Sequence, residues 1–250
     1  MAGAVQSFSD AFSSYRERAA DYVIYSLVMA IASAALSFAI ALCLGVFGIV
    51  TFGSVASVFA SDGSIGFGAV GIGLSLIALF VGVLAVAWAS SGLNGAYFST
   101  LNGFISRRSQ SLGAFFLSVP RHATSIMMIS IITGVLVGAP LVFVLAASPL
   151  LGPLLSIAAI LLVAIYIAFA AFLLIFSVPA AVADGKGPIS AMKASAQASL
   201  GSPAQVIIYA VIAFALAIPA IVPLFNLLYI PLFYMPVSMS ALLRLYRASH

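Results

Sequence analysis

Four long stretches without a charged residue constrain this chain more than any other feature. No Asp, Glu, Lys or Arg lies between Asp21 and Asp62, between Asp62 and Arg107, between Arg121 and Asp184, or between Lys193 and Arg244. About 20 apolar residues are enough for a helix to cross the hydrocarbon of a bilayer. Each stretch can therefore cross at least once, and the last two are long enough to cross twice.

Composition points to the same environment. Hydrophobic residues make up 64% of the chain and charged residues only 6%, whereas about 25% of the residues of a soluble domain are charged. A water-soluble fold of 250 residues could not cover so much apolar surface. We therefore predict an all-α, polytopic bundle of transmembrane helices that forms a single domain over residues 1–250.

Gly and Pro residues divide the apolar stretches into six predicted spans. Breaks at 149–153 and 219–223 turn the last two stretches into hairpins. The predicted spans are 22–50, 71–98, 123–146, 154–178, 204–221 and 225–245. Residues 22–61 are long enough for two spans, but we predict one long helix because a seventh crossing would break the charge asymmetry described next.

The basic residues all fall on one side of this six-span layout. They are Arg16, Arg18, Arg107, Arg108, Arg121, Lys186, Lys193, Arg244 and Arg247, whereas the opposite side carries only Asp62. Lys and Arg concentrate in cytoplasmic segments of membrane proteins. We therefore predict a multi-pass protein of the plasma membrane with both termini in the cytoplasm. We expect these basic residues to lie at the membrane surface, and we therefore expect no nucleic-acid partner.

Three similar segments, 9–25, 112–127 and 189–209, each lie on the basic side at the start of a predicted hairpin. Repeated segments of this kind predict repeated structural units. We expect three units over about residues 7–106, 107–183 and 184–250.

Apolar residues recur in these segments at the spacing of one helical face. The stripes comprise Val5, Phe8, Phe12, Tyr15, Ala19 and Tyr22 in and just before the first segment, Leu112, Phe115, Phe116 and Val119 in the second, and Ile189, Met192 and Ala196 in the third. An amphipathic helix in the headgroup layer before each hairpin is the predicted structure. A polar loop with chance periodicity is the alternative.

The segment Val178–Ser195 ends a span near Pro179, turns at Asp184 and Gly185, and restarts at Pro188. It resembles a signature of poorly characterised prokaryotic six-helix membrane proteins of unknown function. That group includes the membrane domain attached to some glycerophosphodiester phosphodiesterases. The stretch Gly92–Tyr97 is similar to the same group. The resemblance implies a fold and no activity, and the phosphodiesterase chemistry belongs to a soluble domain with no counterpart in this sequence.

Few side chains here can perform acid–base chemistry. The acids are Asp10, Glu17, Asp21, Asp62 and Asp184, and the histidines are His122 and His250. None lies in the middle of a predicted span, whereas proton relays usually rely on intramembrane ionisable groups. The sequence contains neither a nucleophile elbow nor a cluster with metal-ligand spacing. We predict a protein that is not an enzyme, with no catalytic residue, metal or cofactor.

Two sets of residues remain as candidates for contacts. The basic residues Arg107, Arg108, Arg121, Lys186 and Lys193 are predicted to contact lipid headgroups, anionic ones in particular. Asn94 and Asn226 are predicted either to join helices through hydrogen bonds or to contact a solute. Trp88, Tyr97 and Tyr246 are expected in the aromatic belt at the headgroup level.

The predicted function is that of a scaffold or accessory subunit that packs with lipids, with other membrane subunits or with a second copy of itself. A permease or channel for a neutral or weakly polar solute is the first alternative. A lipid-modifying enzyme at the cytoplasmic interface is the second, and it would place four residues near lipid phosphates, namely Asp184, Lys186, Arg121 and His122. A polar cavity would favour the permease, and convergence of Asp184 and His122 would favour the enzyme.

Overall fold

The structure is a computed structural model that describes residues 3–60, 65–108, 110–150, 152–223 and 225–249, and within these ranges it contains helices and no strand. The helices are α1 (Ala4–Glu17), α2 (Ala19–Ala60), α3 (Ile65–Ile105), α4 (Leu112–Ala147), α5 (Pro153–Leu174), α6 (Ser177–Ala183), α7 (Pro188–Gly201), α8 (Pro203–Ala217), α9 (Phe225–Tyr229) and α10 (Met235–Ala248). Short 3-10 turns follow α4 and α8 at Ser148–Leu150 and Ile218–Ile221, and a π-helical segment, Ile230–Tyr234, joins α9 to α10.

Six helical segments of the described chain are long and apolar enough to cross a membrane. They are Ala19–Gly53, Ser75–Ile105, Leu112–Leu150, Pro153–Ala183, Pro203–Ile221 and Phe225–Ala248. The predicted class, an all-α multi-pass membrane protein, is confirmed. The prediction of one helix rather than two before residue 61 is also confirmed, because α2 continues without a break for 42 residues. Asp62 and His250 lie outside the described residues.

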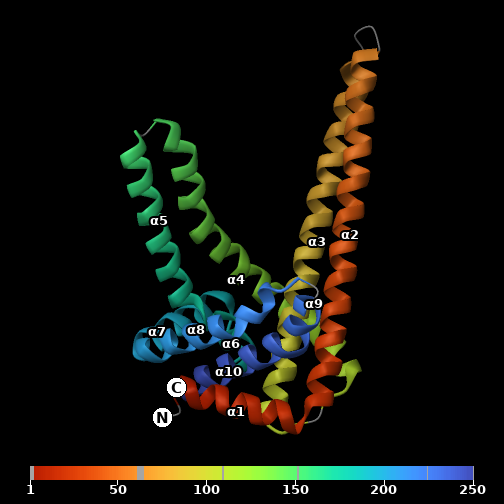
Figure 1. The fold of residues 1–250 in the computed structure, drawn as a ribbon. Helices are drawn as coiled ribbons and strands as arrows, with labels where there is room; N and C mark the ends of the chain where they lie inside the picture. Colours follow the sequence, from red (N-terminus) through yellow and green to blue (C-terminus); the bar gives the residue numbers. More distant parts are fainter. Residues whose placement is uncertain (1–2, 61–64, 109, 151, 224, 250) are drawn as a thin grey trace.

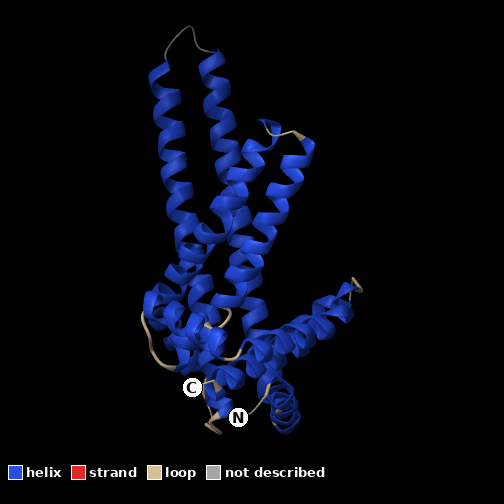
Figure 2. Cartoon of the chain, turned by 90° about the vertical axis from the view of Figure 1, so that its left-hand side faces the viewer, coloured by secondary structure: helices blue, strands red, loops and turns tan. Residues whose placement is uncertain are grey.

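Three helical hairpins leave a common base and do not run side by side (Figure 1). The α2–α3 hairpin and the α4–α5 hairpin extend in the same general direction and diverge from each other. The third hairpin, formed by α8 and α9, projects obliquely from one side of the base (Figure 1 and Figure 2). We call α1, α6, α7, α10, the first turns of α2 and α4 and the last turns of α3 the base. The arms are residues 37–60, 65–87, 130–147 and 153–169.

The protein core lies in the base. One group of buried side chains joins α1, α6, α7, α8 and α10, and a second joins the near ends of α2, α3 and α4 to α10. In contrast, only 6% of the most apolar stretch of the first span and 17% of that of the fourth are buried. The arms are apolar helices, and the side chains that the structure describes there are mostly not covered by this chain, which suits surfaces that face lipid.

Separate helices precede the hairpin in two of the three predicted units, and their place in the headgroup layer stays a prediction. Helices α1 and α7 precede their hairpins as separate elements, but residues 112–119 form the first turns of the continuous 36-residue helix α4. A separate second helix was therefore the wrong expectation. Ser111 explains why the helix begins there, because its side chain accepts a hydrogen bond from the Ala114 N–H and caps the helix.

The buried faces of α1 and α7 differ from the predicted stripes. Val5 and Ile189 are 66% and 76% exposed, whereas the buried positions are mostly small, namely Ala4, Ser7, Phe8 and Ala11 on α1 and Ala191, Ala194, Ser195, Ala198 and Ser199 on α7. Small side chains allow helices to approach closely. The stripes were read from large apolar residues, and several of these point away from the protein.

Candidate functional site

Two glycines of α3 set the distance between α3 and α4 in the base. A Cβ atom added at Gly92 would lie 2.6 Å from the Val119 carbonyl oxygen, and one added at Gly95 would clash with the Cβ of His122. The two helices therefore touch with almost no side chain between them. This contact gives a physical role to the stretch Gly92–Tyr97, and it holds His122 against α3.

A serine of α7 satisfies the backbone at a break between α5 and α6. The helix stops at Leu174 and restarts at Ser177, which frees backbone groups on both sides of the break. The Phe176 N–H donates to Ser195 Oγ (3.0 Å), and the Ser195 hydroxyl donates to the Leu173 carbonyl oxygen (2.7 Å). Ser195 is fully buried. One hydroxyl thus joins α7 to both halves of a broken helix.

A tyrosine of α1 likewise hydrogen-bonds to a backbone carbonyl of the π-helical segment that lacks its helical donor. Pro236 has no N–H, so the Leu232 carbonyl four residues earlier loses its usual helical donor. The Tyr15 hydroxyl donates to this carbonyl oxygen over 2.7 Å, and its ring lies edge-on to Phe233 at 5.7 Å between centroids. Burial raises the pKa of Tyr15, so the hydroxyl keeps the proton that it donates.

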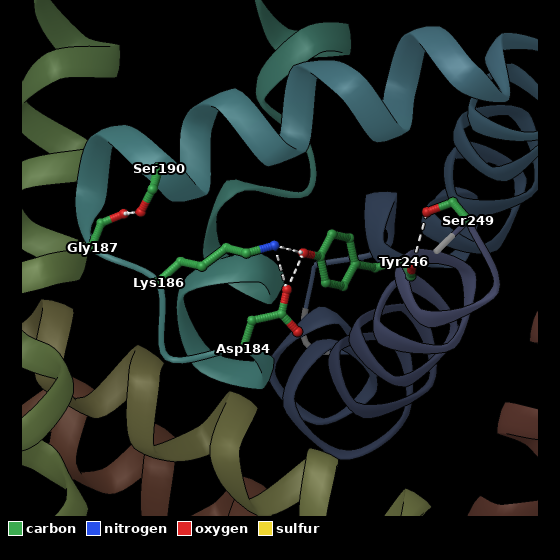
Figure 3. A network of polar contacts seen from close by, with 6 residues as sticks. All are labelled: Asp184, Lys186, Gly187, Ser190, Tyr246 and Ser249. Atoms are coloured by element: carbon green, nitrogen blue, oxygen red, sulfur yellow. Dashed lines mark hydrogen bonds and ion pairs between the residues drawn. The ribbon is translucent and has the colours of Figure 1, made fainter.

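The only ion pair among the described residues lies within the α6–α7 loop, and Tyr246 of α10 hydrogen-bonds to it (Figure 3). Lys186 Nζ lies 2.7 Å from Asp184 Oδ2, and the Tyr246 hydroxyl donates to the same oxygen over 2.6 Å. Lys186 also donates to the Tyr246 oxygen at 3.4 Å. The hydrogen bond with Asp184 raises the pKa of Lys186. The charges of Asp184 and Lys186 neutralise each other, and the hydrogen bonds of Tyr246 fix the loop to the base.

The residues predicted to contact lipid headgroups all lie in or beside the base. Arg107 and Arg108 follow α3, Arg121 is exposed on α4, and Lys193 is exposed on α7. Lys186 differs from the others because its ammonium group already forms an ion pair with Asp184. The structure therefore gathers these side chains at one end of the molecule, and their contact with lipid stays a prediction.

The structure does not bring the two candidate asparagines together. Asn94 is half-buried in the base part of α3, whereas Asn226 is half-buried near the tip of the third hairpin. The candidate catalytic pair is also divided between two environments. His122 packs against Gly95, while Asp184 faces Lys186 and Tyr246. Within the described chain, no three His, Cys, Asp or Glu residues gather as metal ligands would.

Several residues that build the base were missed or misplaced by the sequence reading. Tyr97 and Tyr246 are 0% and 1% exposed, so their expected place in an aromatic belt is wrong. The Tyr97 and Ser26 hydroxyls hydrogen-bond to each other at 2.7 Å inside the protein. Trp88 remains partly exposed and donates to Thr124 Oγ1 at 3.2 Å. Prolines inside helices, such as Pro236, could have indicated where such buried hydrogen bonds are needed. Each of them frees a carbonyl oxygen that needs another donor.

No family description, characterised protein or solved structure matches this chain. The fold alone defines its class, which is that of a polytopic α-helical membrane protein. The resemblance to the prokaryotic six-helix group stays a prediction.

Proposed function

We propose that this protein is a non-enzymatic scaffold or accessory subunit of the cell membrane, with its base and both termini on the cytoplasmic side. Its diverging arms receive the transmembrane helices of another subunit or of a second copy. Its exposed basic residues hold anionic lipid against the base. The proposed orientation follows from the nine basic residues, all of which lie in or beside the base.

The divergence of the hairpins is the observation that carries this proposal (Figure 1). A self-sufficient bundle would cover one face of every helix with its neighbours. Here the arms keep large side chains such as Phe38, Phe80 and Phe143 exposed. Lipid chains are as apolar as these side chains, so helices associate in a membrane through close packing and not through a hydrophobic driving force. Open helical faces of this extent suit a protein that packs with others.

The lining of the arms supports the permease alternative less well than the scaffold role. A groove of about 350 Å³ between α2 and α3 is lined mainly by apolar residues, among them Leu42, Val46 and Leu79. A solute pathway needs polar groups along its length. Neither Asn94 nor Asn226 lines this groove, and the two lie on different hairpins.

Counting subunits in the membrane tests the proposal. The full chain, labelled on one site per copy, is reconstituted into vesicles at decreasing protein-to-lipid ratios, and bleaching steps are counted for single particles. We expect particles with at least two copies, or a membrane protein that remains bound in fixed proportion through purification. A single copy at every dilution, with no such companion, would overturn the scaffold role.

A flux measurement separates the scaffold from the permease. Vesicles that contain the protein are loaded with urea or glycerol, and efflux is compared with that of protein-free vesicles. The scaffold predicts equal rates. Faster efflux that falls on Asn226→Leu substitution, and not on Asn94→Leu substitution, would favour a solute pathway through the third hairpin.

A further inference from the structure

A polar basin of about 330 Å³ lies in the base, where the end of α1, the end of α3 and α10 meet. Its charged lining residues are Asp10 and Glu17 of α1, Arg18 at the end of α1, Arg107 after α3, and Arg244 of α10. These three arginines come from three separate parts of the sequence. Three guanidinium groups and two carboxylates around one cavity leave a single positive charge in excess.

The charges that line this basin do not neutralise one another directly. Among the described residues, the ion pair at Asp184 is the only one within 4.0 Å, and it lies elsewhere in the base. Glu17 accepts a hydrogen bond from Ser13 at 3.3 Å, and Arg18 donates to the Arg108 carbonyl oxygen at 3.5 Å. Arg244 Nε is buried and has no hydrogen-bond partner. A buried donor of this kind costs free energy unless something bonds to it.

Arg107 reaches the basin from an unusual backbone conformation. Its φ is +57°, the only positive φ at a non-glycine residue of the described chain. Helix α3 ends there, because the Arg108 N–H bonds to the Gly103 carbonyl and the Arg107 N–H bonds to the Phe104 carbonyl. Glycine is the usual residue at such a position, since a Cβ atom disfavours the left-handed region. The arginine at this position is therefore in a backbone conformation that costs free energy, and it lines the basin.

We propose that this basin binds a phosphate ester that carries an amine, of the phosphoethanolamine type. The guanidinium groups of Arg18, Arg107 and Arg244 would hold the phosphate, for which guanidinium donors are suited. The Asp10 and Glu17 carboxylates would hold the ammonium group. The volume lies at the lower end of the range for small-molecule sites. The ligand is the headgroup of a lipid or a soluble phosphate ester, and the site does not depend on the proposed scaffold role.

Calorimetry on the full chain in a nonionic detergent tests the soluble ligand. O-phosphoethanolamine, inorganic phosphate and ethanolamine are titrated separately. We expect O-phosphoethanolamine to bind at least tenfold more tightly than either of the others. Asp10→Asn should abolish this preference while binding of inorganic phosphate is kept.

Arg107→Gly is the decisive variant, because glycine suits a positive φ. Its melting temperature should equal or exceed that of the wild type, while affinity for O-phosphoethanolamine falls at least tenfold. Arg108→Gln is the matched control, since Arg108 does not line the basin, and its affinity should stay within twofold of the wild type. Equal losses in the two variants would point to general surface charge and overturn the proposal.

Lipid retention distinguishes the two sources of the ligand. The wild type and Arg107→Gly are extracted from nanodiscs that contain equal amounts of phosphatidylethanolamine and phosphatidylglycerol, and bound lipid is identified by native mass spectrometry. Retention of phosphatidylethanolamine by the wild type alone identifies a lipid headgroup. Binding of the soluble ester without this retention identifies a soluble compound. Absence of both results would overturn the proposal.

Discussion

The base and the arms of this protein are stabilised in different ways. In the base and where the third hairpin joins it, side chains satisfy backbone groups that breaks and prolines release, and tyrosine hydroxyls donate to the carbonyl oxygens of Leu232 and Ser238. In the arms, long helices satisfy most of their own backbone, although Pro140 in α4 removes one helical hydrogen bond, and most of the side chains that the structure describes there are uncovered. Long helices in lipid thus need fewer specific partners than the places where helices break, and most of the contacts that specify this fold lie in the base.

The largest difference between the two regions is expected for added volume at glycines. Gly95→Ala should lower the free energy of unfolding by about 3 kcal/mol, because the new methyl group would overlap the Cβ of His122. Gly134→Ala in an arm meets nothing within 4 Å. It should leave stability unchanged or raise it by up to about 1 kcal/mol through helix propensity. Denaturant unfolding in detergent micelles measures both, and similar losses in the two variants would contradict the distinction.

A smaller loss is expected for the serine that joins α7 to the break after α5. Ser195→Ala should cost about 2 kcal/mol, since the Phe176 N–H and the Leu173 carbonyl would lose their buried partner. Ser199→Ala is the matched control one turn further along α7. Ser199 is equally buried but its hydroxyl has no hydrogen-bond partner, so its removal should be neutral or stabilising. The same unfolding measurement compares them, and a Ser199→Ala loss as large as that of Ser195→Ala would refute the assigned role.

Loss of a single tyrosine hydroxyl should have a smaller effect again. Tyr15→Phe leaves the Leu232 carbonyl without its donor and should lower stability by about 1 kcal/mol. Tyr166→Phe in α5 removes a hydroxyl from a side chain that is 40% exposed on an arm, and no measurable change is expected. Hydrogen exchange at residues 230–236 should rise in Tyr15→Phe alone. Unchanged exchange there would show that the π-helical segment does not need α1.

The smallest expected effect concerns the pH dependence of the Asp184–Lys186 pair. The hydrogen bond to Asp184 raises the pKa of Lys186 above its ordinary value of 10.5, so at neutral pH and up to that value the ammonium group carries its full charge and the pair contributes fully. Its contribution is lost as the pH rises through the higher pKa of the folded protein. Both side chains are about a third exposed, at 33% and 35%, which limits the effect to below about 1 kcal/mol.

Lys186→Met should therefore be less stable than the wild type at neutral pH, and the difference should shrink above pH 10.5. Lys193→Met, on the exposed side of α7, is the control and should follow the wild type at every pH. A difference between Lys186→Met and the wild type that is independent of pH would show that the ammonium charge is not the stabilising feature.

Charge and hydropathy predicted much of this fold from the sequence. The charge-free stretches and the placement of the nine basic residues gave six spans, a single long α2 and one basic end, because lipid excludes charge wherever a helix crosses it. These properties follow from the solvent and need no knowledge of packing. The three-unit repeat stays a prediction.

The arrangement of the hairpins could not be predicted in this way. In water, alternation of polar and apolar residues shows which face is buried, but a span in lipid is apolar on all sides. The sequence therefore contained no signal for the divergence of the arms or for the oblique third hairpin. The roles of Ser195 and Tyr15 were missed because each partner carbonyl is far away in the sequence.

The separation of the arms is the central claim, and one distance measurement tests it directly. Spin labels are placed at Val50 in α2 and Leu145 in α4, after replacement of the single cysteine by Cys43→Ala, and the full chain is reconstituted in nanodiscs. Pulsed electron resonance should report a separation far beyond the 8–10 Å between the axes of packed helices. A single short distance, as in a closed six-helix bundle, would contradict the diverging arms and the scaffold role built on them.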